Sequence, residues 1–288
     1  MLQVARLGPR LLGDSAALVL DFLRSQMNED GGFRDRSGQS DLYYSVFGIE
    51  GLLALRAPLP VDQIASYLGS FGDGQTLDLV HVSCLARCWA DLPADTRRDA
   101  PRSAILERLA RFRSADGAYA SDVGARRGTI YACFLATCGY QDAGAELPDS
   151  QAVIRCIRRL QTEDGGFANG DELPMGLTPT SAAAATLLRN LGEPVPQELG
   201  EWLLARHHRE GGFLATPLAP IPDLLSTATA LHALAGMQVS LEAVKEPCLD
   251  FLDSLWTNRG GFYGNWTEDV IDCEYTYYGL LALGHLSL

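Results

Sequence analysis

The chain has 288 residues, a formal net charge of −13 at pH 7 and 47% hydrophobic residues. This length fits one large domain or two ordinary ones, and the apolar fraction is sufficient for a sizeable buried core. The negative charge argues against nucleic acid and against an anionic membrane surface as partners.

The amino-terminal stretch, MLQVARLGPRLLGDSAALVL, has scattered basic residues and no compact apolar segment of the kind found in signal peptides. The longest apolar runs of the chain extend over about a dozen residues, which is too short to span a bilayer. The seven cysteines include no Cys-x-x-Cys pair and fall mostly on helix-like segments. These features predict reduced, buried thiols in a cytoplasmic protein without a transmembrane segment.

A glycine-aromatic turn recurs at intervals of roughly 45 residues, a length typical of helical-hairpin repeats. It reads EDGGF at 29–33, DGAY at 116–119, EDGGF at 163–167, EGGF at 210–213 and RGGF at 259–262, with a degenerate copy, FGDGQ, at 71–75. Each turn follows an amphipathic segment, such as SAALVLDFLRSQM or QAVIRCIRRLQ, with apolar residues at three- and four-residue spacing. We therefore expect outer helices that are capped by left-handed glycines, with Gly pairs at 31–32, 165–166, 211–212 and 260–261.

A second set of helices is expected after the polar loops. Their predicted N-caps are Asp41, Asp78, Thr129, Thr178 or Thr180, Asp223 and Asp272. The segments that follow, such as SVFGIEGLLAL and TSAAAATLL, are apolar on nearly all sides and should be buried. The last of them is as apolar as the rest, whereas an open solenoid ends in atypical polar caps. We therefore predict one all-α domain, residues 1–288, in which six inner and six outer helices form a closed α6–α6 double barrel. All inner helices should start at the same end of the ring.

The repeat resembles that of the β subunits of protein prenyltransferases and of the class II terpene cyclases, which share a Q-x-x-x-G-G-F/W type of turn. QTEDGGF at 161–167 matches this turn well, and the resemblance covers nearly the whole chain. Residues 29–55 look most like the final repeat of the β subunit of Rab geranylgeranyltransferase, and residues 126–137 look like its His-Ala-Gly-Gln-Ile-Tyr repeat. The resemblance implies an α/α barrel that binds an isoprenoid in a central aromatic cavity.

Protein prenyltransferases hold a catalytic zinc with Asp, Cys and His at inner helix starts. The resemblance places Asp272 on the Asp, Glu274 on the Cys and, if the ring closes, Tyr44 on the His. His81 fits an Asp-x-x-His pattern, but no alignment supplies the full triad. We therefore expect no stoichiometric zinc, and Asp272, Glu274 and His81 as ligands if zinc is held. Arg126 takes the position of a family histidine that contacts the diphosphate.

Class II cyclases protonate an alkene or epoxide with an Asp at an inner helix start. Two alignments are possible, one with Glu274 as the proton donor and one with Asp272, and they remain alternatives. Carbocations are stabilised by aromatic faces, and the candidate aromatic residues are Tyr43, Tyr44, Tyr275, Tyr277 and Tyr278. Two features argue the other way: known class II cyclases place the site between two barrels, and Asp272 and Glu274 also suit plain helix capping and the helix dipole.

The leading hypothesis is an isoprenoid-handling enzyme with acid-initiated, terpene cyclase-like chemistry. Its catalytic candidates are Asp272 and Glu274, and its substrate-binding candidates are Tyr43, Tyr44, Tyr275, Tyr278, His81 and Arg126. One alternative is a prenyltransferase β-subunit-like transferase with a helical α partner, and another is a non-catalytic barrel that binds a lipid or a protein. No cofactor is expected, although zinc and magnesium remain open.

Overall fold

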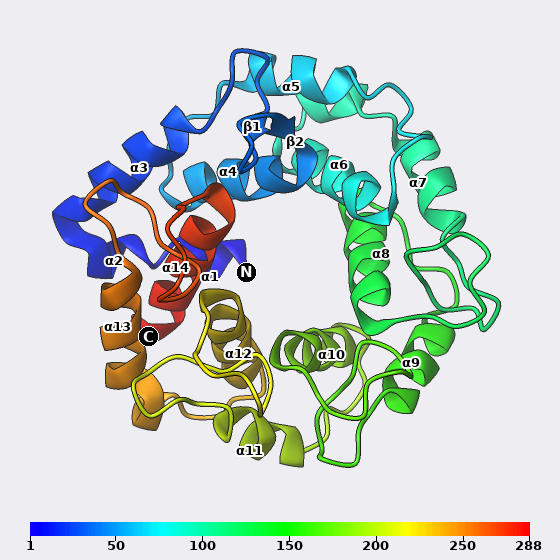
Figure 1. Ribbon diagram of the computed structural model, residues 1–288. Coiled ribbons are helices and arrows are strands. Elements are labelled where there is room, and N and C mark those ends of the chain that lie inside the picture. The colour runs from blue at the N-terminus through cyan, green and yellow to red at the C-terminus, as the bar shows by residue number, and fades with distance from the viewer.

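The computed structural model describes all of residues 1–288, and its helices form two concentric rings (Figure 1). The inner helices are α4 (Leu42–Ala54), α6 (Leu79–Asp91), α8 (Ile130–Asp142), α10 (Thr178–Asn190), α12 (Leu224–Gly236) and α14 (Cys273–Leu286). The outer helices are α3 (Ala16–Ser25), α5 (Val61–Gly69), α7 (Arg102–Ala110), α9 (Ser150–Arg159), α11 (Glu198–Leu204) and α13 (Glu242–Leu255). Consecutive inner helices pack on one another and α14 packs on α4, so the ring is closed and the predicted double barrel is confirmed.

Shorter elements complete the fold. They are α1 (Leu2–Ala5), α2 (Pro9–Leu12), the 3-10 helices η1 (Gly13–Ser15) and η2 (Thr96–Asp99), and the strands β1 (Phe33–Arg34) and β2 (Ser40–Asp41). The antiparallel pair of β1 and β2 closes the first turn, with Phe33 opposite Asp41. Helix α1 packs against α14 and α4, which places the first residues near the axis of the ring.

The glycine-aromatic motif forms a tight hairpin after five of the six outer helices, all except α5. In α3 the helix ends at Ser25 with a right-handed C-cap at Gln26, and Gly31, with a φ of 91°, lies in the following turn. The prediction that the Gly pairs cap the outer helices is therefore wrong. The helices end earlier because the chain must reverse direction, and the left-handed glycine makes that reversal: an N–H of Asn28 donates to the carbonyl of Gly32 at 2.8 Å.

The aromatic residue of the motif fastens this hairpin to the next inner helix. Phe167 is buried, and its backbone N–H donates to the Ser181 hydroxyl at 2.9 Å. The same bond joins Phe33 to Ser45, Phe213 to Thr227 and Phe262 to Thr276. A buried N–H without a partner destabilises a fold, so at four of the six inner helices, α4, α10, α12 and α14, a hydroxyl near the helix start fixes the position of the loop above it.

Five of the six predicted N-caps are confirmed, since the side chain of each accepts a hydrogen bond from a backbone N–H in the first turn; they are Asp41, Asp78, Thr129, Asp223 and Asp272. The prediction of Thr178 or Thr180 is wrong, because Leu177 occupies the N-cap of α10. The Thr178 hydroxyl instead donates to the carbonyl of Leu214 at 2.6 Å. Pro179 in the first turn has no N–H to satisfy.

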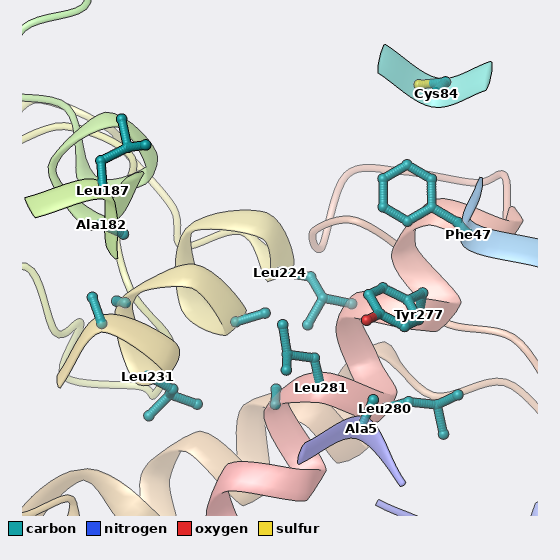
Figure 2. Close-up of a cluster of buried hydrophobic side chains, with 14 of the residues drawn as sticks. Ala5, Phe47, Cys84, Ala182, Leu187, Leu224, Leu231, Tyr277, Leu280 and Leu281 are labelled. Carbon is teal, nitrogen blue, oxygen red and sulfur yellow. The ribbon is translucent and has the colours of Figure 1, made fainter. Parts of the chain in front are cut away.

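The core fills the space between the two rings and between neighbouring inner helices. Figure 2 shows part of it, including Leu224 of α12 and Tyr277, Leu280 and Leu281 of α14. The seven cysteines are unpaired and all except Cys138 are buried, which agrees with their predicted place on helices. No helix has both the length and the apolar character that crossing a membrane requires.

Candidate functional site

All inner helices start at one end of the ring, where the loops that follow the outer helices also lie (Figure 1). The first turns of α4 and α14 are neighbours because the ring closes between the first and last repeats. Most of the predicted site residues therefore meet there, although they are separated by more than two hundred positions in the sequence.

Asp272 is buried at the start of α14, and both of its carboxylate oxygens are engaged. Its Oδ1 accepts from the N–H of Tyr275 at 2.9 Å, and its Oδ2 accepts from Nε of Arg36 at 3.0 Å. Arg36 also contacts Glu268 at 3.1 Å. Burial raises the pKa of Asp272, whereas the helix N–H and the arginine oppose that shift. Arg36 lies in the turn between β1 and β2, and it was not predicted as a site residue.

Glu274 lies two residues after Asp272, in the first turn of α14, and has a different environment. Its Oε1 accepts from the hydroxyl of Tyr43 at 2.6 Å, and no protein group donates to its Oε2. Burial raises the pKa of Glu274 to about 7, and the Tyr43 hydrogen bond opposes this shift. A carboxyl with this pKa is protonated for part of the time at neutral pH, which is the condition that general acid catalysis requires.

Several tyrosines lie within range of the charge of this carboxyl. Tyr44, Tyr275 and Tyr278 join Tyr43, and Tyr131 from α8 completes a group of five. Burial raises the pKa of every one of these hydroxyls, and the charge of Glu274 adds to each shift; the residues are Tyr43, Tyr44, Tyr131, Tyr275 and Tyr278. The charge of Glu274 therefore reaches all five hydroxyls, and Tyr43 is the one that contacts its carboxylate directly.

Tyr131 was not predicted as a site residue, although its position relative to the N-cap of its helix could have indicated it. It is the second residue after the N-cap Thr129, as Tyr43 is after Asp41 and Glu274 after Asp272. This shared position brings the three side chains into one group. Deeper in the ring, Phe47 contacts Tyr277, with ring centroids 5.9 Å apart (Figure 2). Phe47 also contacts Tyr43 and Tyr278, with ring centroids at 5.0 and 5.4 Å. Tyr277 is fully buried and belongs to the core.

His81 lies on the other side of α4, at the start of α6. Its Nε2 contacts Asp41 at 3.2 Å and its Nδ1 contacts Asp78 at 2.8 Å. The hydrogen bond to Asp41 is the main cause that raises the pKa of His81 to about 9, so the imidazole is protonated at neutral pH. Arg126 is exposed on the loop before α8, and its side chain makes no hydrogen bond or ion pair.

The side chains that would bind zinc at the hypothetical site already bind other residues. Arg36 binds Asp272, Tyr43 binds Glu274, and two carboxylates occupy both nitrogens of His81. No group of three or more His, Cys, Asp or Glu side chains is arranged to hold a metal ion. These residues do not fit the zinc of the protein prenyltransferases, which needs a deprotonated ligand set with free lone pairs.

Three overlapping stretches of the sequence, residues 9–82, 61–217 and 197–287, match the profile of the prenyltransferase alpha-alpha toroid domain. The chain belongs to the prenyltransferase alpha-alpha toroid family. None of the curated proteins matches this toroid chain in sequence.

Solved structures share the toroid at low sequence identity. The type II terpene cyclase MstE from Scytonema, in complex with geranylgeranyl dihydroxybenzoate, is 14% identical with a TM-score of 0.62, and 97% of each chain is covered. Protein geranylgeranyltransferase-I from Candida albicans, complexed with GGPP, is 16% identical with a TM-score of 0.52, and 99% of this chain and 83% of that chain are covered. A polysaccharide lyase is 13% identical with a TM-score of 0.57 over 95% and 97% of the chains. The likeness establishes the fold alone.

The comparison with MstE corrects one expectation from the sequence. A terpene cyclase of type II was expected to need two barrels, but MstE and this toroid chain cover 97% of one another. MstE therefore has about the length of one such toroid.

Proposed function

We propose that this chain is an isoprenoid-handling enzyme that starts a terpene cyclase-like reaction by protonating its substrate from Glu274. Membership of the toroid family supports an isoprenoid as the substrate class. A cyclase and a transferase of the same fold, whose complexes contain geranylgeranyl compounds, support it as well. The observation that carries the proposal is the environment of Glu274: a carboxyl of pKa about 7 with one oxygen bound by Tyr43 and the other free.

The proposed reaction begins with Oε2 of Glu274. Its O–H bond breaks as the proton forms a C–H bond with one carbon of the terminal alkene, and the π electrons of that alkene supply the new bond. The neighbouring carbon becomes a cation, which the next alkene attacks to close a ring. Loss of a proton to water ends the sequence, and solvent restores the proton of Glu274. The tyrosine faces stabilise the positive charge.

Asp272 is proposed to have a positioning role. Its two oxygens hold the α14 N-terminus and the Arg36 guanidinium, so neither is free to give a proton to a substrate. The zinc-dependent transferase alternative is not favoured, because the donor set does not fit the metal. We retain the expectation that the reaction uses no metal cofactor.

Two variants test the proposal. Turnover is followed by mass spectrometry with squalene, geranylgeraniol and geranylgeranyl diphosphate as trial substrates. Glu274→Gln keeps the shape but removes the acid, and a loss on the order of 10²–10⁴-fold in rate is expected with little change in thermal stability. Asp272→Asn still caps the helix and should keep measurable turnover. Full activity of Glu274→Gln would refute the assignment, as would loss of activity in Asp272→Asn alone.

A further inference from the structure

The outer ring carries a groove that the proposed reaction does not use. It has a volume of about 670 Å³ and lies between α5 and η2, the 3-10 helix that precedes α7. Figure 1 shows α5 and α7 as neighbours on the outer ring, and both pack on α6. Binding sites for ligands in proteins commonly have volumes in this range. None of its lining residues belongs to the site around Glu274.

One wall of the groove is a single face of α5. Asp62, Ala65, Ser66 and Gly69 line it at three- and four-residue spacing, which places them on the same side of the helix. The three residues that follow Asp62 in this row are small. The wall therefore leaves room for the backbone of another chain to approach the helix closely.

The groove contains three carboxylates and no cation among its lining residues. Asp62 lies at the start of α5, and Asp95 and Asp99 lie across from it at the two ends of η2. Arg98 pairs with Asp95 at 3.3 Å. Asp62 and Asp99 are exposed and have no ion pair, so the groove keeps two net negative charges.

The other arginines of this segment bind backbone oxygens. Arg97 donates to the carbonyl of Leu92 at 3.0 and 3.3 Å, and Arg102 donates to the carbonyl of Gly144. Neither lines the groove. The three carboxylates are also not arranged to hold a metal ion, so their charge suits cationic side chains of a ligand.

Trp89 of α6 supplies an observation that is independent of the charges. It lines the groove although only 4% of it is exposed, and its indole N–H donates to no protein group. A buried donor without an acceptor is unfavourable. A ligand that brings an oxygen to this N–H therefore gains a hydrogen bond that the free protein lacks.

We propose that this groove binds an extended segment of a partner protein that is rich in arginine or lysine. Its cationic side chains pair with Asp62 and Asp99, and one of its backbone carbonyls accepts from the indole N–H of Trp89. A small polyamine would satisfy the carboxylates but has no oxygen for the indole. The formal charge of −13 on the whole chain attracts such a segment before contact.

The test uses three probes: a hexapeptide of alternating arginine and glycine with blocked ends, the same peptide with glutamine in place of arginine, and spermidine. Calorimetric titration should give the arginine peptide an affinity about tenfold or more above that of the other two, since it alone has both cations and carbonyls. Added salt should weaken its binding. Tryptophan fluorescence should change on binding, and Trp89→Phe should abolish that change.

Variants locate the binding. Asp62→Asn and Asp99→Asn should each lower the affinity for the arginine peptide about threefold, as expected for exposed ion pairs. Trp89→Phe keeps an aromatic ring but loses the N–H, and should lower it about fivefold without changing the affinity for spermidine. Asp250→Asn is the matched control, because it removes an exposed, unpaired carboxylate from the outer helix α13.

Three outcomes overturn the inference. The first is equal binding of the two peptides, or no binding of either. The second is binding of spermidine as tight as that of the arginine peptide, which would show a site for small cations only. The third is an equal loss of affinity in Asp250→Asn and Asp62→Asn, which would show that the peptide follows the general charge of the protein. None of them affects the proposal for Glu274, which is tested by turnover.

Discussion

Tyr43→Phe should raise the pKa of Glu274, because it removes the hydroxyl that donates to Oε1 at 2.6 Å and keeps the ring. A hydrogen bond to the charged form of an acid stabilises that form. Such bonds contribute about 1.5–3 kcal/mol, and one pKa unit corresponds to about 1.4 kcal/mol. Since Glu274 is only partly buried, we expect the lower limit, a rise of about one unit.

The shift is measured by carbon NMR on protein labelled at the glutamate carboxyl carbon, with Glu274→Gln to assign the signal. The rate should show the same change: wild-type activity falls as pH rises through about 7, where Glu274 loses its proton, and the fall should move to higher pH in the variant. Tyr44→Phe is the matched control, since Tyr44 lies near Glu274 without a hydrogen bond to it. An unchanged or lower pKa in Tyr43→Phe, or an equal rise in Tyr44→Phe, would refute this reasoning.

Three further predictions test the scaffold and its charges. Ser181→Ala leaves the buried N–H of Phe167 without an acceptor and should lower the free energy of unfolding, measured with urea, by about 1–3 kcal/mol. Ser181→Thr keeps a hydroxyl, as two sibling repeats do at this position, and should lower it less. Equal losses in the two variants would contradict the role of the hydroxyl. Gly211→Ala should destabilise far more than Gly192→Ala, because both have positive φ but only at Gly211 would a Cβ lie 1.9 Å from a backbone oxygen; similar melting temperatures would contradict this. The pKa of His81 is raised from 6.5 to about 9, so its contribution to stability is complete below pH 6.5 and is lost as pH rises through 9; the stability advantage of wild type over His81→Asn should shrink across that window, and a constant difference would show that the ion pairs contribute nothing.

The architecture could be predicted because each repeat carries its own local signals. Apolar periodicity separated inner from outer helices, and the N-cap residues marked the inner helix starts at five of six positions. The sixth failed at Thr178, whose hydroxyl is used by a carbonyl of the next repeat, Leu214. No local pattern reports such a tertiary contact.

The candidate site was predicted in part for the same reason. Tyr43 and Glu274 were named from the sequence, but their hydrogen bond depends on ring closure between residues 231 positions apart. Arg36 was missed because nothing within its own loop indicates that it reaches Asp272. The available signal was the opposite charge of Arg36 and Glu268, which lie in two loops that ring closure brings together. The sequence could not decide between Glu274 and Asp272, because both lie at the predicted start of the same helix. The hydrogen bonds of the structure were needed for that choice.

Solvent deuterium incorporation tests the central proposal most directly. If Glu274 protonates an alkene, cyclisation in heavy water must leave one solvent deuteron bound to carbon in the product, and mass spectrometry reads it as a gain of about one mass unit. The proposal predicts this label in the product of the wild-type protein and no cyclised product from Glu274→Gln. A cyclised product without the label, or a labelled product from Glu274→Gln, would contradict it.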